Sequence, residues 1–418
     1  MLYKKRKTLL TAFSLGFCSV LTGQNVSSPY SVLGVGDLDS RDYSRYYFSG
    51  NSGISRQNPA AYNQANPASL SSLFYKSIHL DISMRGRNSV FKMPDEDTTL
   101  EPTKNFAIKR LSVAFKPGKK TGIAFGLQPY SSVNYQFIQS KVILDGTTPY
   151  YKSVEGSGGI HQFYVSAGTS LSKKISAGVT ASWLFGSLQR TSTFSSSVID
   201  LNVVREERDY YNAAKFLAGL QYASKRKKWE HQIGITASAI SKPKGQSTTT
   251  VYDGTTEALK EITENGKYKL PLSASFGYSA VYKDRITLNG SAEYNSWKKQ
   301  KLDYPDSYTG DALRLSAGME VALNSKKWPG KNERPYLGIG INADKSYMRI
   351  QGRELWDYYA TIGGGLTLTR NFTAWAGLEW GLKGRSSLNQ IKERYTQYVL
   401  GFSIKDIWFA TRKFGRYN

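Results

Sequence analysis

Three histidines are the side chains of this sequence best suited to proton transfer, and a single cysteine is the one strong nucleophile. They are His79, His161 and His231, with Cys18. A lipase of the bacterial envelope needs a serine within hydrogen-bond reach of a histidine base, and a third group that orients the base. Ser157 and Ser166 lie near His161 in the sequence, but their spacing singles out no nucleophile. We therefore expect no catalytic residues and no enzymatic activity.

Metal and cofactor chemistry has little support in the residue pattern. One cysteine excludes a cysteine-based zinc site. The histidines are not spaced as metal ligands, and no phosphate-binding or dinucleotide-binding glycine pattern stands between a strand and a helix. We expect no metal site and no cofactor.

The composition bounds the class of protein. The chain has 418 residues and a net charge of +24, from 56 Lys+Arg and 32 Asp+Glu, which first suggests a nucleic-acid partner. With 40% apolar and 13% aromatic residues, it is too rich in apolar pattern to be disordered. After the N-terminus, no run of about 18 uncharged apolar residues occurs, so no membrane-spanning helix is expected.

Residues 1–23 have the pattern of a secretory signal peptide. Four cations at positions 4–7 precede an apolar segment and a region of small residues that ends at Gly23. Cleavage after Gly23 removes the only cysteine and lowers the net charge to +20. A lipid anchor on Cys18 is the alternative, although Phe17 stands where a small residue is expected. An exported chain without cysteine suits a bacterial envelope, where we expect no nucleic-acid partner.

From Ser77 onward, stretches of apolar residues alternate with small or polar ones. One such row is Ile175, Ala177, Val179, Ala181, Trp183 and Phe185. A period of two gives a strand with one face against an apolar phase and the other against a polar one. The pattern predicts fourteen strands, at residues 77–87, 105–116, 121–138, 158–171, 175–187, 211–223, 229–241, 268–282, 286–297, 311–324, 335–346, 355–369, 372–384 and 394–404.

The links between these strands alternate in length. The short links are 117–120, 172–174, 224–228, 283–285, 325–334 and 370–371, and the long links are 88–104, 139–157, 188–210, 242–267, 298–310, 347–354 and 385–393. Outer-membrane barrels have short periplasmic turns on one rim and longer extracellular loops on the other. A closed barrel also satisfies every backbone polar group in lipid. We therefore predict an all-β transmembrane up-and-down barrel of about 14 antiparallel strands over residues 77–418.

A soluble β-sandwich or propeller is the alternative to a membrane barrel, because sandwich strands also alternate. The strands expected here are long for a soluble protein, where about five or six residues is usual. Aromatic residues also gather near the strand ends, as in the interfacial girdles of membrane barrels. We therefore place the protein in the outer membrane of a Gram-negative bacterium, in contact with outer-membrane lipid and lipopolysaccharide.

The short links carry most of the positive charge. They and their edges hold sixteen cations and two anions, Asp284 and Glu333. These residues are interpreted either as solvated turns or as contacts with anionic lipid headgroups of the inner leaflet. Neither interpretation requires a nucleic acid.

Residues 24–76 precede the first strand and show no strand-length alternation. They are rich in Ser, Asn, Gly, Tyr and Pro and contain Asn58-Pro59-Ala60 and Asn66-Pro67-Ala68. Asn-Pro favours turns, and a fourteen-stranded barrel has a lumen wide enough to need filling or to conduct. We predict that residues 24–76 form a compact plug, or hatch, in the lumen; a flexible leader is the alternative.

The layout resembles the FadL-type outer-membrane transporters of hydrophobic compounds. In that family an N-terminal hatch fills a fourteen-stranded barrel and carries an Asn-Pro-Ala motif before the first strand, where Asn66, Pro67 and Ala68 stand here. Residues 28–31 (Ser-Pro-Tyr-Ser), 34–38 (Gly-Val-Gly-Asp-Leu) and 407–409 (Ile-Trp-Phe) are similar to a Bacteroidota branch of such barrels.

The resemblance also implies a kinked third strand that opens a lateral gate toward the membrane. Pro129 cannot donate a hydrogen bond to the neighbouring strand, and Gly126 weakens the same strand. Gly126 and Pro129 are therefore the candidates for this kink. A strand end or a bulge at the rim is the alternative interpretation.

Two functions remain. The first is an outer-membrane channel in which hydrophobic or amphipathic molecules, such as long-chain fatty acids, diffuse past a gating plug. The second is an accessory or structural barrel of a secretion machine of the type IX kind, with envelope proteins as partners and no small-molecule transport. A transporter needs a continuous apolar pocket and a cation for a fatty-acid carboxylate, and the sequence does not identify that cation. A docking subunit tolerates a polar, blocked lumen.

Overall fold

The computed structural model describes ten stretches of the chain. They are 28–93, 102–144, 148–196, 201–241, 244–253, 258–265, 269–302, 306–323, 333–369 and 371–407. The predicted signal peptide and the Trp408-Phe409 pair lie outside the described residues. The helices within these stretches are 3-10 helices, η1 (Pro29–Val32), η2 (Tyr47–Ser49), η3 (Pro67–Ser72) and η4 (Ser386–Leu388). None of the described helices has the length and apolar character needed to span a membrane.

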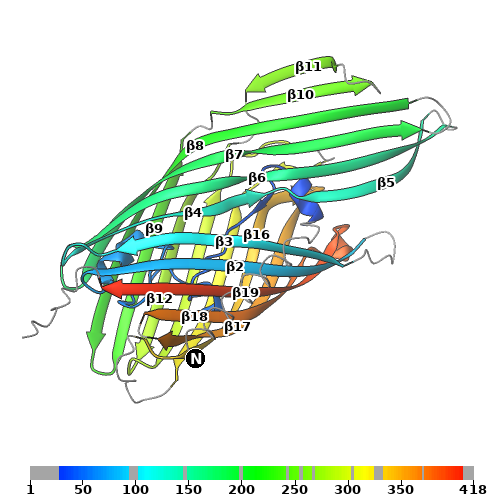
Figure 1. The fold of residues 1–418 in the computed structure, drawn as a ribbon. Coiled ribbons are helices and arrows are strands. Elements are labelled where there is room, and N and C mark those ends of the chain that lie inside the picture. Colours follow the sequence, from blue (N-terminus) through cyan, green and yellow to red (C-terminus); the bar gives the residue numbers. More distant parts are fainter. Residues whose placement is uncertain are drawn as a thin grey trace, which may run out of the picture.

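One antiparallel sheet forms the wall of the molecule. Its strands are β2 (Ser77–Lys92), β3 (Thr103–Phe115), β4 (Thr121–Ser132) continued by β5 (Tyr135–Leu144), β6 (Thr148–Ser170), β7 (Ile175–Ser196), β8 (Leu201–Arg226), β9 (Trp229–Ile240), β12 (Leu272–Tyr282), β13 (Ile286–Ser296), β15 (Ala312–Ala322), β16 (Tyr336–Ile350), β17 (Arg353–Thr369), β18 (Phe372–Lys383) and β19 (Lys392–Ile407). β19 pairs with β2 along its whole length, from Ile407 opposite Ser77 to Lys392 opposite Lys92 (Figure 1). The wall is therefore a closed barrel of fourteen strands when β4 and β5 count as one, and the predicted fold is confirmed.

All fourteen predicted strands are present, but the prediction of several long links was wrong. Most of residues 139–157 and 188–210 belong to β5, β6, β7 and β8, and most of 347–354 belongs to β16 and β17. The extensions of β7 and β8, residues 188–196 and 201–210, are rich in Ser, Thr and charged residues, whereas Tyr347 and Met348 of β16 are buried inside the barrel. The extensions of β7 and β8 rise beyond the membrane-facing band, so neither of their faces needs to be apolar, while their threonines and valines still favour extended chain.

A hairpin continues this raised sheet at one side of the barrel. Its strands are β10 (Gln246–Asp253) and β11 (Ala258–Asn265), within the link that was expected to be a loop. β10 pairs with the upper part of β8, whereas β9 pairs directly with β12. The hairpin therefore lies outside the closed wall, beside the raised ends of β6, β7 and β8 (Figure 1).

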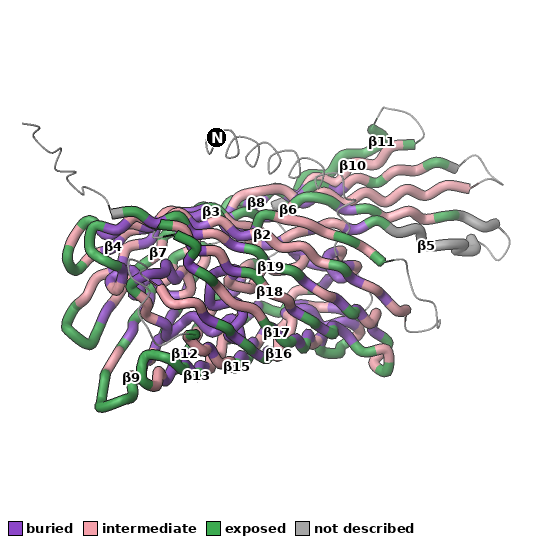
Figure 2. The backbone as a smooth tube through the Cα atoms, turned by 60° about the horizontal axis from the view of Figure 1, so that its bottom comes forward, coloured by how far each residue is buried: buried purple, intermediate pink, exposed green. Residues whose placement is uncertain are grey.

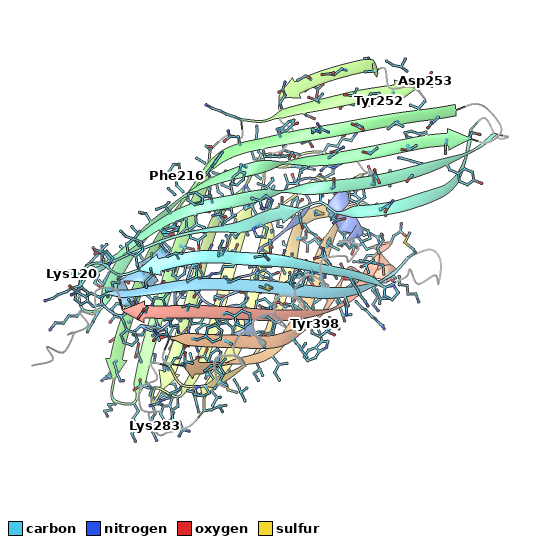
Figure 3. The ribbon with its side chains drawn as sticks, viewed as in Figure 1. Lys120, Phe216, Tyr252, Asp253, Lys283 and Tyr398 are labelled. Atoms are coloured by element: carbon cyan, nitrogen blue, oxygen red, sulfur yellow. The ribbon has the colours of Figure 1, made fainter. Side chains whose placement is uncertain are left out.

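Exposed and buried positions alternate along the wall strands (Figure 2). The outward row is apolar, and Phe216 and Tyr398 project from β8 and β19 (Figure 3). The inward row is largely polar and includes the buried carboxylates of Glu320, Glu379 and Glu393. This is the pattern of a barrel with lipid outside and polar contacts inside, and it supports an outer-membrane location.

The two rims differ in their turns. Lys120 and Lys283 lie at the end with short turns, and Tyr252 and Asp253 lie at the opposite end (Figure 3). By the general rule for such barrels, the first end is periplasmic and the second extracellular.

Two charged residues of the short links are not solvated, contrary to the simplest sequence interpretation. Lys116 is buried, and its Nζ donates to the carbonyl of Ser71. The side chain of Glu333 is 7% exposed and lies 2.9 Å from the Nζ of Lys405. Both residues face the N-terminal segment within the barrel, because Ser71 of that segment accepts from Lys116 and its Arg45 lies 3.0 Å from Glu333.

Residues 28–76, called the luminal segment below, lie within the barrel. The segment begins near the extracellular end, where Ser28 donates to Glu393, and reaches the periplasmic end, where Lys76 N–H donates to the carbonyl of Lys116. Its two ends pack in apolar clusters. The extracellular cluster includes Tyr30, Leu33, Val35, Ile160, Leu184, Leu188, Trp297 and Tyr347, and the periplasmic cluster includes Tyr62, Leu70, Leu73, Ala114, Ala124 and Tyr164.

Candidate functional site: the luminal segment and the seam beside the third strand

The predicted Asn-Pro-Ala motif begins helix η3. Asn66 is its N-cap, and its Oδ1 accepts a hydrogen bond from Ala68 N–H at 3.1 Å. The Nδ2 of Asn66 donates to the carbonyls of Ile54, at 3.0 Å, and of Leu220 on β8, at 3.1 Å. Asn66 is fully buried, so one side chain joins the helix, the rest of the luminal segment and the wall.

Glycines on four neighbouring strands make room for this motif. Paired in register across the wall, they are Gly122 on β4, Gly168 on β6, Gly178 on β7 and Gly219 on β8. A Cβ added at any of the four would clash with Asn66, Pro67 or Leu70. The luminal backbone therefore rests directly on the wall at this level.

Arg41 of the luminal segment is bound to two acids of the wall. It lies 3.0 Å from Asp357 on β17 and 3.0 Å from Glu379 on β18, and it donates to Tyr395 Oη at 2.8 Å. Burial alone would lower the pKa of Arg41, but Glu379 beside it raises the pKa well above its usual value. The guanidinium therefore remains charged in the lumen.

Arg45 and Arg56 share a second acidic site. Both lie 3.1 Å from Glu320 on β15, and Arg45 also lies 3.0 Å from Glu333. Burial would raise the pKa of Glu333, but Arg45 and Lys405 outweigh burial and hold it below its usual value. The luminal segment is thereby attached to the part of the wall opposite η3.

Acids of the luminal segment complete the set of contacts with wall cations. The pairs are Asp37–Lys383 at 2.7 Å, Asp39–Lys109 at 2.5 Å and Asp42–Arg110 at 3.0 Å. Burial would raise the pKa of Asp37, but Lys383 holds it below its usual value. Charges of both signs thus alternate between segment and wall, so neither surface is left with buried unpaired charge at these positions.

The wall is incompletely paired beside its third strand. β3 and β4 pair only from Leu111 opposite Leu127 to Phe115 opposite Ile123, and the rest of β3 pairs with β2 alone among the described residues. We call the unpaired stretch between β3 and β4 the seam. Because a membrane barrel cannot leave strand edges in lipid, the seam requires a partner for β4.

The luminal segment supplies that partner. Strand β1 (Asp37–Leu38) pairs with β4, with Asp37 opposite Ser132 and Leu38 opposite Ser131. Asp39 N–H then donates to the carbonyl of Tyr130 at 2.9 Å. Asp39 also binds Lys109 of β3, so the segment bridges both sides of the seam.

The two predicted kink residues lie at the seam and perform different tasks. Pro129 stands where the pairing of β4 with β6 shifts register, two residues past the last β3 pair. Gly126 still pairs with β3, and a Cβ there would clash with Tyr164 Oη and the carbonyl of Leu111. The break is therefore at Pro129, while Gly126 makes room for an inward tyrosine. Their role as a lateral gate stays a prediction.

Two small cavities lie between the luminal segment and the wall in the part of the chain that the structure describes. One of about 100 Å³ is lined by residues from both sides of the seam, including Arg85, Asp39 and Lys109. The other, of about 220 Å³, is lined by Pro129 and mainly by Ser, Thr, Asn, Gln and charged residues. Neither cavity provides the continuous apolar pocket that a hydrophobic transporter needs.

The whole length of the barrel is matched by one family of proteins. A model of the family named BamG matches residues 5–415. The chain belongs to the BamG family. No curated protein sequence matches it.

Solved structures with a fold similar to that of this BamG-family barrel include two toluene transporters and a FadL homologue. The toluene transporter TodX of Pseudomonas putida is 13% identical, with a TM-score of 0.58 over 89% of this chain and 99% of that chain. A Pseudomonas aeruginosa FadL homologue is 12% identical, with a TM-score of 0.55 over 93% and 100%. The Ralstonia pickettii toluene transporter TbuX is 12% identical, with a TM-score of 0.53 over 87% and 98%. At these identities the likeness establishes the fold, and the FadL-type resemblance is confirmed.

The histidines of the BamG-family barrel are divided between its two surfaces. His79 is buried and lies 3.1 Å from Ser77 Oγ, but its Nδ1 has no partner among the described residues, so no acid orients it. His231 lies outside and contacts Tyr278 Oη at 2.7 Å. His161 is opposite Pro129 on β6. The described residues contain no group of three or more His, Cys, Asp or Glu placed to hold a metal.

Sequence reasoning missed the residues that fix the luminal segment. The inward acids are Glu320, Asp357, Glu379 and Glu393, and the glycines at the motif are Gly122, Gly168, Gly178 and Gly219. A signal for the acids was present, because a carboxylate in the middle of a membrane strand must face the lumen. The glycines gave no such signal, since a small residue fits either face of a strand.

Proposed function

We propose that this BamG-family barrel is a sealed accessory subunit of a multi-protein assembly or secretion machine of the outer membrane, and that it transports no small molecule. The observation that carries the proposal is the filled lumen. The luminal segment is tied to opposite parts of the wall by buried ion pairs, and the two cavities described above are small and lined mainly by polar residues.

The apolar part of the lumen is also occupied. Tyr30, Leu33 and Val35 of the luminal segment are almost completely buried against inward apolar residues of the wall. A hydrophobic ligand at this level would have to displace them. The chain thus fills the site that a transported ligand would need.

Withdrawal of the segment would be costly. It would leave the carboxylates of Glu320 and Glu379 buried without their arginines, and breaking a buried pair in this way costs about 3–5 kcal/mol. Several such pairs act together, which favours a permanent seal over a gate that opens in each transport cycle.

The matched family supports the subunit role. The match to the family named BamG covers residues 5–415, so the chain is classified apart from the transporters whose fold it shares. In this role the barrel presents its outer wall, its periplasmic turns and the raised sheet of β6, β7, β8, β10 and β11 to envelope proteins.

Depletion of the protein in its own bacterium tests this role. We expect the amount of other folded outer-membrane barrels to fall, as measured by heat-modifiable migration, while uptake of a labelled fatty acid or toluene per cell is unchanged. Normal levels of folded barrels together with lost uptake would contradict the proposal and favour a channel.

A channel for hydrophobic molecules is the second candidate, and one residue favours it. Arg85 lines the smaller cavity and donates to Asn105 at 2.7 Å, and no carboxylate of the described residues lies within ion-pair distance of it. It is therefore placed to receive a carboxylate that enters along the seam. If the barrel is a fatty-acid channel, Arg85→Gln should lower fatty-acid uptake and leave toluene uptake unchanged; equal uptake of fatty acid by variant and wild type would remove this support.

A further inference from the structure

A groove of about 1020 Å³ crosses the outer wall over β15 to β19. It lies on the lipid-facing side, because Leu315, Ile341 and Tyr358, which line it, are 45%, 66% and 41% exposed. Alanines on three neighbouring strands, among them Ala343 and Ala360, form its floor. Its volume is at the upper end of the range of ligand pockets, roughly 300–1,000 Å³.

Arginines stand at one end of this groove. Arg394 on β19 lines it and is exposed, with no hydrogen bond or ion pair to any described residue. The guanidinium of Arg385, in the link before β19, lies 5.8 Å from the ring centre of Tyr358, which also lines the groove. Glu354 on the same rim is already engaged by Lys345, at 3.2 Å, and does not neutralise them.

The topology places these arginines at the outer leaflet. β19 begins at Lys392 on the long-loop rim, so Arg394 is two residues inside the wall. A cation facing lipid at this depth requires an anionic partner. Arginine matches phosphate in geometry as well as in charge, because its planar donors form paired hydrogen bonds with phosphate oxygens.

We propose that this groove is a binding site for a phosphate-bearing lipid of the outer leaflet, of the lipid A class. Its acyl chains lie along the alanine floor between Tyr358, Trp380 and Leu315, and a phosphate contacts Arg394 and Arg385. The inference is independent of whether the lumen conducts.

A second outer groove offers a matched comparison. It measures about 680 Å³, crosses β4 to β9 and is lined by Ala, Gly, Thr, Val, Leu and Ile residues, including Ala237, with no charged residue. It can take acyl chains but has no cation for a phosphate. Lipid bound there should show no preference for charge.

Native mass spectrometry of the full-length protein in detergent, titrated with purified lipid A, tests the site. We expect the bound fraction to fall about fivefold for each arginine removed in Arg394→Gln and Arg385→Gln. Ala343→Trp should fill the floor and abolish binding. The matched controls are Ala237→Trp in the second groove and Arg208→Gln on the exposed face of β8, both of which should bind lipid A as the wild type does.

Three results would overturn the proposal. Equal lipid A binding by the Arg394→Gln/Arg385→Gln and Ala343→Trp variants would show that the lipid binds elsewhere. Equal retention of phosphatidylethanolamine and lipid A would remove the role of the arginines. Loss of a protein partner with Ala343→Trp, while lipid A binding persists, would assign the groove to another protein. All substituted side chains lie on the outer surface of the barrel or in an exposed link, so the thermal stability of each variant should match the wild type and confirm folding.

Discussion

Single residues of the luminal segment attach the segment to the wall. Asn66 could be selected from the sequence because Asn-Pro favours a turn and stands just before the first strand. Its hydrogen bonds to the rest of the molecule could not be foreseen, since their acceptors include carbonyls distant in sequence, on Ile54 and Leu220. Likewise, no periodic pattern in the sequence around Arg41 and Arg45 predicts which acids of the wall strands they contact.

Asn66→Ala should loosen the luminal segment. It removes the cap of η3, which contributes about 1 kcal/mol, and leaves buried carbonyls without donors, at about 1–3 kcal/mol each. The temperature of unfolding in detergent, followed by circular dichroism, should fall by several degrees. Asn371→Ala, in an exposed turn, is the control and should not change it; equal unfolding temperatures for both variants would remove Asn66 as an anchor.

Glu333 should make the segment sensitive to acid. Its pKa in the folded chain lies below the usual value because of Arg45 and Lys405. The carboxylate therefore stabilises the fold above about pH 4.5, and this contribution is lost as pH falls through the folded pKa. Below that pH, the protease sensitivity of the segment should rise more in the wild type than in Glu333→Gln. Parallel pH profiles would contradict a stabilising role for this pair.

At the scale of elements, the strands could be predicted and the seam only in part. The period of two located all fourteen wall strands, and Pro129 marked the break in the third, because proline cannot donate to a neighbouring strand. Strand β1, two residues long, has no period to detect, and neither β10 (Gln246–Asp253) nor β11 (Ala258–Asn265) has an apolar row with a period of two. The hairpin of β10 and β11 can be recognised only in the three-dimensional structure, where β10 pairs with the upper part of β8.

A disulfide should lock β1 in the seam. Leu38 and Ser131 are opposite each other in an antiparallel pair, where Cα separations of about 4.5–5.5 Å suit a disulfide. Leu38→Cys/Ser131→Cys should oxidise readily, since the predicted mature chain has no other cysteine. The locked protein should restore folded outer-membrane barrels in depleted cells as well as the reduced form does. If folded outer-membrane barrels were restored only after the disulfide was reduced, the seam would have to open for the protein to function.

The β10–β11 hairpin should be dispensable for folding. β9 pairs directly with β12, with Ser238 opposite Ser273, so the wall closes without the hairpin. Replacing residues 242–267 with a short Gly-Ser link should leave the unfolding temperature of the barrel within a few degrees of the wild type. Failure of this variant to fold would show that the raised sheet is part of the stable core.

At the scale of the whole molecule, the barrel and its orientation follow from alternation and link length, whereas the state of the lumen does not. The positive net charge reflects the orientation of the barrel, because exposed lysines such as Lys120 and Lys283 lie at the periplasmic turns (Figure 3). The exceptions, Lys116 and Glu333, turn inward because the luminal segment offers them partners. Whether a barrel conducts depends on such contacts between distant residues, which a one-dimensional pattern does not contain.

Single-channel conductance in planar bilayers tests the sealed lumen most directly. The mature wild-type protein should insert without steady conductance. A variant lacking residues 24–70 should form open pores, because nothing then fills the lumen or covers the seam, while β19 still pairs with β2. Steady conductance of the wild type, or an unchanged trace after the deletion, would contradict a lumen sealed by the luminal segment.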